Sequence, residues 1–165
     1  MIGVQSIIAL TEGLTPDQAR WKPTSQDWSI LEVINHLYDE EREDFRLRVQ
    51  QTIERPSEPL PPIDPERWAI ERHDNDRELV ACLEAFVRER RASLTWLATL
   101  RFEDWDRRLN HPRLAELRVG DVLAAWAGHD LLHIRQLNEL RWLYLNIQMA
   151  PYELRYAGDW YVLLP

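Results

Sequence analysis

The stretch Trp28–Leu37, with the sequence WSILEVINHL, decides the fold. Ser29 can cap the free amides at the start of a helix, and Glu32, three residues later, can reach back to the Ser29 amide, so the pair fits a capping box. The apolar residues that follow recur at the spacing of one helical face. These residues are Ile30, Val33, Ile34, Leu37, Tyr38 and Phe45. The sequence therefore predicts an amphipathic helix that begins at Ser29 and ends before Pro56.

Three further segments repeat apolar residues at helical spacing on either side of this helix. We expect a short helix at about 2–12, a third helix at about 75–100 and a fourth at about 119–144. The segment 56–65 holds five of the ten prolines and is predicted to be a loop that crosses outside the bundle. Four helices with one long crossover predict an all-α four-helix bundle, in a single domain that spans residues 1–165.

The composition narrows the classes of function. The chain has 28 acidic and 20 basic residues, for a net charge of -8, which argues against a protein that binds nucleic acid through clustered cations. No apolar run approaches the roughly 20 residues of a membrane span, and the first residues lack the pattern of a secretory signal. We therefore expect no nucleic-acid partner, no membrane segment and a cytoplasmic location. Arg88, Arg90 and Arg91 are predicted to form a solvated helix face, and Cys82 to be buried.

Two histidines of the fourth helix can share a metal ion. His129 and His133 are four residues apart, which places both side chains on one face of a helix, one turn apart. The same stripe carries Val122, Trp126, Leu137, Leu140 and Tyr144, so both imidazoles are expected to face the core. Each buried ring nitrogen needs a partner, and a metal ion can serve as one for both rings. Hydrogen bonds to neighbouring core groups are the alternative, and this motif alone leaves both interpretations open.

His36 can complete the site. It lies about two turns into the second helix, at the border of the apolar stripe. If the second and fourth helices are neighbours, three imidazole nitrogens meet, and three protein ligands with an open position are typical of catalytic metal sites. We expect the carboxylates of Glu40 and Asp130 to lie at the surface rather than to support this site. His73 and His111 are expected to be exposed in polar loops.

Two motifs in this chain resemble those of the DinB-like superfamily. They are W-S-x-x-E-V-x-x-H-L at Trp28–Leu37 and H-x-x-x-H-x-x-Q at His129–Gln136, and the turn Leu14–Pro23 is similar as well. The resemblance implies an up-up-down-down bundle that holds one divalent metal through His36, His129 and His133. It also implies homodimers and, for some relatives, enzymes that use a low-molecular-weight thiol such as bacillithiol or mycothiol.

Three hypotheses follow for function. In the first, Zn²⁺, Ni²⁺, Fe²⁺ or Mn²⁺ activates a thiol or a water against a small electrophilic substrate beside Trp126, as in a thiol S-transferase or a related lyase or hydrolase. In the second, the chain is a metal-binding stress or interaction protein without turnover. In the third, the histidines are core polar groups of a plain structural bundle.

Overall fold

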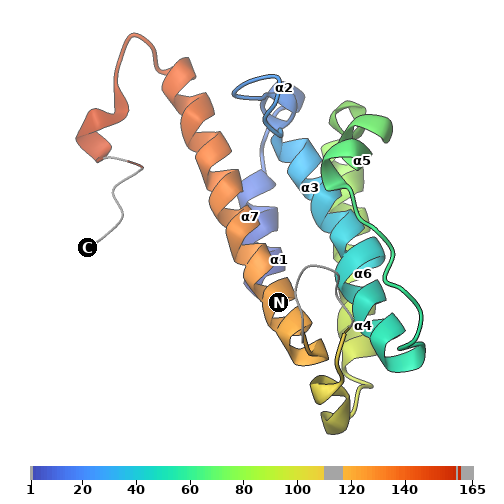
Figure 1. The fold of residues 1–165 in the computed structure, drawn as a ribbon. Coiled ribbons are helices and arrows are strands. Elements are labelled where there is room, and N and C mark those ends of the chain that lie inside the picture. Colours follow the sequence, from blue (N-terminus) through green and yellow to red (C-terminus); the bar gives the residue numbers. More distant parts are fainter. Residues whose placement is uncertain (1, 110–116, 159, 161–165) are drawn as a thin grey trace.

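A computed structural model shows a bundle of helices and describes residues 2–109, 117–158 and 160 (Figure 1). The bundle consists of α1 (Ile2–Thr11), α3 (Ile30–Asp39) continued by α4 (Phe45–Glu54), α6 (Leu79–Leu97) and α7 (Val119–Gln148). Short helices α2 (Pro16–Arg20) and α5 (Pro65–Glu71) cover one end. Three 3₁₀ turns, at Asp74–Asp76, Phe102–Asp106 and Leu154–Ala157, complete the regular elements of the described part. The predicted all-α four-helix bundle is confirmed.

The start of α3 is built as the sequence predicts. The Ser29 hydroxyl accepts a hydrogen bond from the Glu32 amide (3.1 Å), and the Glu32 carboxylate accepts one from the Ser29 amide (2.8 Å). A π-helical segment, Glu40–Asp44, follows α3 and leads directly into α4. The predicted second helix is therefore one long element that contains a π segment, and such segments are frequent at functional sites.

Contacts between helices define their directions. Ser29 bonds to Asn75 and Arg46 bonds to Glu89, so α3–α4 and α6 run parallel. Arg141 of α7 donates to the Leu10 carbonyl of α1, and Gly3 lies so close to Asp130 that a Cβ there would meet the carboxylate at 2.5 Å. Because residues 3 and 10 of α1 meet residues 130 and 141 of α7 in the same order, these two helices are also parallel.

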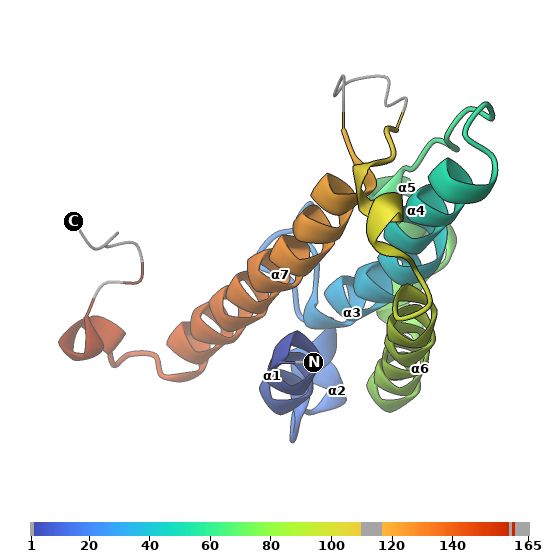
Figure 2. The ribbon, with the colours of Figure 1, turned by 90° about the horizontal axis from the view of Figure 1, so that it is seen from below.

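In chain order the bundle therefore reads up, down, down, up, which corrects the predicted order up, up, down, down (Figures 1 and 2). The segment 12–29, with α2, reverses the chain between α1 and α3. The Pro-rich segment 55–64 and α5 then return the chain along the length of the bundle, so that α6 starts at the same end as α3. The predicted crossover is thus present, and it makes the two middle helices parallel.

The third helix begins later than predicted. Asn75 does not cap it, because the Asn75 side chain accepts a hydrogen bond from Ser29 and donates one to the Arg20 carbonyl. Residues that we expected at the end of the crossover and in the following loop form α5, with Pro65 in its first turn and Asp64 as its cap. Short capped helices such as this one are hard to predict, since they carry too few residues to show a period.

Two groups of buried side chains form the core. The larger includes Leu31, Ile34, Phe86 and Leu137, and it joins α1, α3, α6 and α7. The smaller includes Phe45, Val49, Val119 and Trp126 and lies toward the start of α7. Cys82 is buried, as expected. No helix among the described residues is long and apolar enough to cross a membrane.

A buried network of charges ties three elements together. The Arg90 guanidinium of α6 donates to Glu41 of the π segment (2.6 Å) and, through two nitrogens, to Asp130 of α7 (2.6 and 2.7 Å). The Trp126 indole also donates to Glu41 (2.8 Å), whose side chain is completely buried. Asp130 and Arg90 were expected at the surface, and both predictions are wrong, because Asp130 is buried and the Arg90 side chain is only 12% exposed. Arg88 and Arg91 are exposed, as predicted.

Arg90 should be far more important for stability than its neighbour Arg91. Arg90→Met removes the only cation of the described network and leaves the carboxylates of Glu41 and Asp130 buried without it, which costs about 3–5 kcal/mol. Arg91→Met, the matched control on the exposed face of the same helix, should change stability by less than about 0.5 kcal/mol. Urea unfolding of both variants measures the difference. Equal effects would show that the network does not hold the helices together.

Candidate metal centre

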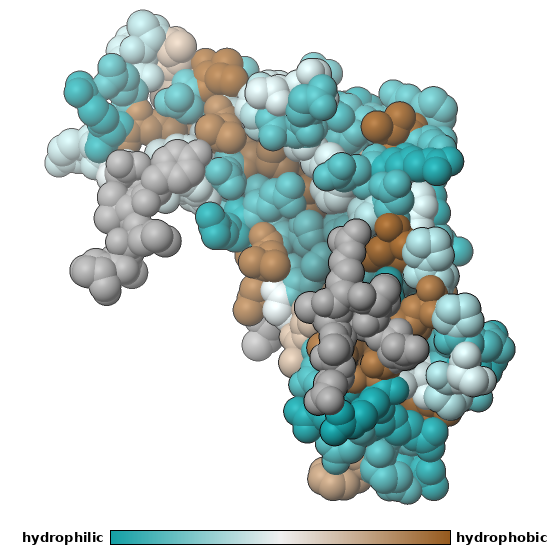
Figure 3. Space-filling model, in the orientation of Figure 1, coloured by the Kyte–Doolittle hydropathy of each residue, from teal (hydrophilic) through white to brown (hydrophobic). Residues whose placement is uncertain are grey.

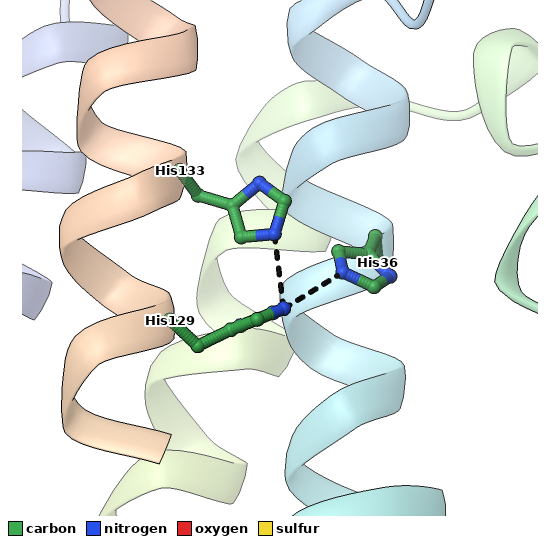
Figure 4. Close-up of side chains that lie close together, drawn as sticks. All are labelled: His36, His129 and His133. Carbon is green, nitrogen blue, oxygen red and sulfur yellow. Dashed lines mark hydrogen bonds between the residues drawn. The ribbon is translucent and has the colours of Figure 1, made fainter. Parts of the chain in front are cut away.

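Three histidines from two antiparallel helices converge at one point (Figure 4). His129 and His133 lie one turn apart on α7, and His36 faces them from α3. The Nε2 atom of His129 is 3.3 Å from Nε2 of His36 and 3.1 Å from Nε2 of His133. All three sequence-predicted ligands are therefore brought together, with one nitrogen from each within 4.8 Å of the others.

These distances fit a divalent metal ion. Two imidazole nitrogens bound tetrahedrally to zinc at about 2.0–2.1 Å are separated by about 3.3–3.4 Å. The separations of 3.3 and 3.1 Å lie close to this value. An ion bound here would thus have His129 and each of the other two histidines close to their bound separations.

Hydrogen bonds between the rings cannot satisfy the cluster. A ring nitrogen of a neutral histidine carries either one hydrogen or one lone pair, so Nε2 of His129 cannot make two separate, well-directed hydrogen bonds. It nevertheless lies within 3.3 Å of both Nε2 of His36 and Nε2 of His133. A metal ion would remove this conflict, because each of the three nitrogens could then present its lone pair to the ion.

The second nitrogens of two rings also have neighbours. Nδ1 of His133 lies 2.8 Å from Oε1 of Gln136 and can donate to it, which leaves a lone pair on Nε2, the form that binds metal. Nδ1 of His36 lies 3.8 Å from Oε1 of Glu40, whose side chain is almost completely buried. Our expectation of a surface position for Glu40 is therefore wrong. Gln136 is the last residue of the motif H-x-x-x-H-x-x-Q, but the sequence alone did not predict its contact with His133.

Aromatic side chains enclose the histidines. The ring of Trp28 lies 4.8 Å from that of His36, and the ring of Phe45 lies 5.2 Å from that of His129, measured between centroids. Trp126, which we expected beside a substrate, is mostly buried, stacked on Phe45 and bonded to Glu41, and it also lines a cavity of about 550 Å³. His36 is buried, whereas His129 and His133 are partly exposed, so the cluster is open on the side of α7.

The surroundings keep the three imidazoles neutral. Burial, reinforced by the nearby His133 and His129, lowers the pKa of His36 to about 2. Burial and the adjacent His133 lower the pKa of His129 to about 4, and burial also lowers the pKa of His133. Neutral rings are required for metal binding, so no proton competes for the ligand nitrogens near pH 7.

The other two histidines do not join the site. His73 is exposed and lies 3.8 Å from the Asp76 carboxylate, as expected for a loop residue. His111 lies outside the described residues. Two cavities, of about 600 and 550 Å³, open elsewhere on the bundle and are lined by none of the three clustered histidines.

Comparison with known proteins identifies relatives of this chain. A family model described as the DinB superfamily matches residues 5–137. The chain is 26% identical to the Bacillus subtilis protein YuaE, over 79% of this chain and 87% of that protein. It is 24% identical to a Bacillus cereus protein named "Putative metal-dependent hydrolase", over 69% of this chain and 65% of that protein, slightly less than two thirds of its length.

A solved structure has the same fold. YfiT from Bacillus subtilis, described as a "probable metal-dependent hydrolase with an unusual four-helix bundle topology", superposes with a TM-score of 0.75 at 18% identity. The match covers 84% of this chain and 79% of YfiT. At this level of identity the likeness establishes the four-helix-bundle fold.

The stability of the metal-free protein should fall as the pH decreases below about 6.5. Below this pH His36 and His129 become protonated in the unfolded chain but stay neutral in the folded chain, where their pKa values are about 2 and 4. Each of these two histidines therefore lowers the free energy of unfolding by up to about 1.4 kcal/mol for each unit by which the pH falls. Urea unfolding in the presence of a chelator at pH 7, 6 and 5 measures the slope. His36→Gln should reduce this slope, whereas His73→Gln should not. Equal slopes in the two variants would show that the pKa of His36 is not lowered by folding.

Proposed function

The chain belongs to the DinB superfamily, and on that premise we propose that it is a metal-dependent enzyme that acts on a small electrophilic substrate. The convergence of three Nε2 atoms from His36, His129 and His133 carries the proposal. The separations of His36 and His133 from His129 match those of imidazoles around one ion, and burial keeps all three rings neutral.

The donor set limits the metal to a few ions. Imidazole nitrogens suit Zn²⁺, Ni²⁺ and Fe²⁺ best, with Mn²⁺ a weaker possibility, and availability selects among ions of similar affinity. Three protein ligands leave at least one position open, which is typical of catalytic rather than structural sites. A divalent ion held here supplies a Lewis acid that lowers the pKa of a water or a thiol placed at the open position.

The protein's own residues prepare this position. Gln136 holds His133 in the tautomer that directs a lone pair at the centre of the cluster. The rings of Trp28 and Phe45 cover His36 and His129 and exclude water from those sides. The partial exposure of His129 and His133 leaves an approach for a substrate along α7.

Hydrolysis is the reaction that we favour. Relatives of this chain carry names that specify metal-dependent hydrolases, which supports a water as the nucleophile. A low-molecular-weight thiol could occupy the same open position in an S-transferase, and the two reactions differ in their products. Hydrolysis cleaves a bond of the substrate with one water and needs no thiol. Transfer consumes one thiol, forms a carbon–sulfur bond, and releases the substrate's leaving group together with the thiol's proton.

Metal content tests the site directly. Purified without a metal-affinity tag and reloaded with zinc or nickel, the native chain should hold about one equivalent of ion. His129→Ala removes the nitrogen that lies within 3.3 Å of both other ligands, and it should reduce affinity at least about 100-fold. His73→Ala, the matched control at an exposed histidine, should retain the full equivalent, as measured by elemental analysis.

The outcomes separate the hypotheses. If neither the native chain nor the control holds metal after reloading, the proposal fails and the histidines are core polar groups. If metal binds at one equivalent, a panel of esters, amides and alkylating electrophiles, each assayed with and without added thiols, distinguishes hydrolysis from thiol transfer. A loaded protein that turns over none of them would favour metal binding without catalysis.

A further inference from the structure

A second cavity, remote from the histidines, opens near the end of α7. Its volume is about 600 Å³, and it lies between the C-terminal half of α7, the turn around Leu14 and Thr15, and Trp160. Figure 3 shows apolar surface over this end of α7, where Leu145, Ile147 and Met149 are exposed. Arg141, which lines the cavity, follows His133 by eight residues, about 12 Å along the helix. The cavity is therefore separate from the candidate metal centre.

The polar groups of this cavity include amides, hydroxyls and one guanidinium, and the NH₂ of the lining residue Asn138 donates to the Ile134 carbonyl. In the capping box of α2, the Thr15 hydroxyl oxygen accepts from the Gln18 amide, and the Gln18 side-chain oxygen accepts from the Thr15 amide. These bonds use acceptor atoms of both side chains and leave the Thr15 O–H and the Gln18 NH₂ as donors. Arg141 has donors only, and one of its nitrogens is fixed by the Leu10 carbonyl at 2.5 Å.

The charge of the cavity contrasts with that of the chain. Arg141 is the one charged side chain among the described lining residues, and none of these residues is acidic. The chain as a whole carries a net charge of -8. Because acidic residues outnumber basic ones in the chain, a cavity whose described lining has one cation and no carboxylate favours an anionic ligand.

Aromatic rings form the walls. Trp142 and Trp160 stack with centroids 5.5 Å apart, and Tyr144, also in the lining, meets Trp21 edge to face at 5.5 Å. Indole and phenol rings offer flat apolar faces with little conformational entropy to lose, and they pair well with another planar ring. The apolar walls and the Arg141 guanidinium thus lie side by side in one cavity.

We propose that this cavity binds a planar, aromatic organic anion, with the ring against Trp142 and Trp160 and the anionic group at Arg141. The site is independent of metal binding and of the proposed reaction. Its ligand is recognised by charge and shape together, so that an uncharged molecule with the same rings should bind more weakly.

A matched pair of fluorescent probes tests the site on the full chain. 1-Anilinonaphthalene-8-sulfonate has the expected chemistry, and N-phenyl-1-naphthylamine is the same ring system without the sulfonate. The anionic probe should bind the native chain saturably, with about one site per chain. Arg141→Gln should weaken that binding about tenfold and leave the binding of the uncharged probe unchanged. Trp142→Leu should weaken the binding of both probes.

Arg135→Gln is the matched control, since Arg135 is an exposed arginine of the same helix outside the cavity lining. It makes the same change in net charge and should leave both affinities unaltered. Absence of saturable binding, or equal weakening by the Arg141 and Arg135 variants, would overturn the proposal. Sedimentation at the same protein concentrations tests whether a second copy of the chain covers the cavity instead. An oligomer that does not bind the anionic probe would also overturn the proposal.

Discussion

The contact of Arg90 with Glu41 and Asp130 is the constraint on which the geometry of the histidines depends. The guanidinium of α6 binds a carboxylate of the π segment and a carboxylate of α7 at 2.6–2.7 Å, away from water. A buried charge must keep its partners, because the cost of leaving it alone is several kcal/mol. The network therefore fixes the register of α7 against the long second helix. His129 precedes Asp130 directly in the sequence, so this register also places the imidazoles.

Burial then determines the chemistry of the cluster. Once the helices are in register, the Nε2 atoms of His36 and His133 lie 3.3 and 3.1 Å from Nε2 of His129, in a setting that disfavours imidazolium. Desolvation keeps the rings neutral, and neutral rings at these distances have unshared lone pairs that cannot all be satisfied by one another. The same fold thus creates both the candidate ligands and the need for a partner, and the proposed divalent ion would meet that need.

Much of this could be predicted from local patterns in the sequence. Three features depend only on residues that are close in sequence, and the structure contains all three. They are the capping box at Ser29, the crossover at 56–65 and the i,i+4 spacing of His129 and His133. The direction of the helices, the π segment and the burial of Asp130 could not be predicted in this way. Each depends on which helix lies beside which, as when Arg90 meets a carboxylate 40 positions away.

A crystal structure of the metal-loaded protein is the most direct test of the proposed three-histidine metal site. Crystals grown with zinc and measured above and below its absorption edge locate the ion without assumptions about the ligands. We expect one ion for each chain, bonded to Nε2 of His36, His129 and His133 at about 2.0–2.1 Å, with Gln136 still bonded to His133. An ion bound elsewhere, or three histidines without an ion in zinc-saturated crystals, would contradict it.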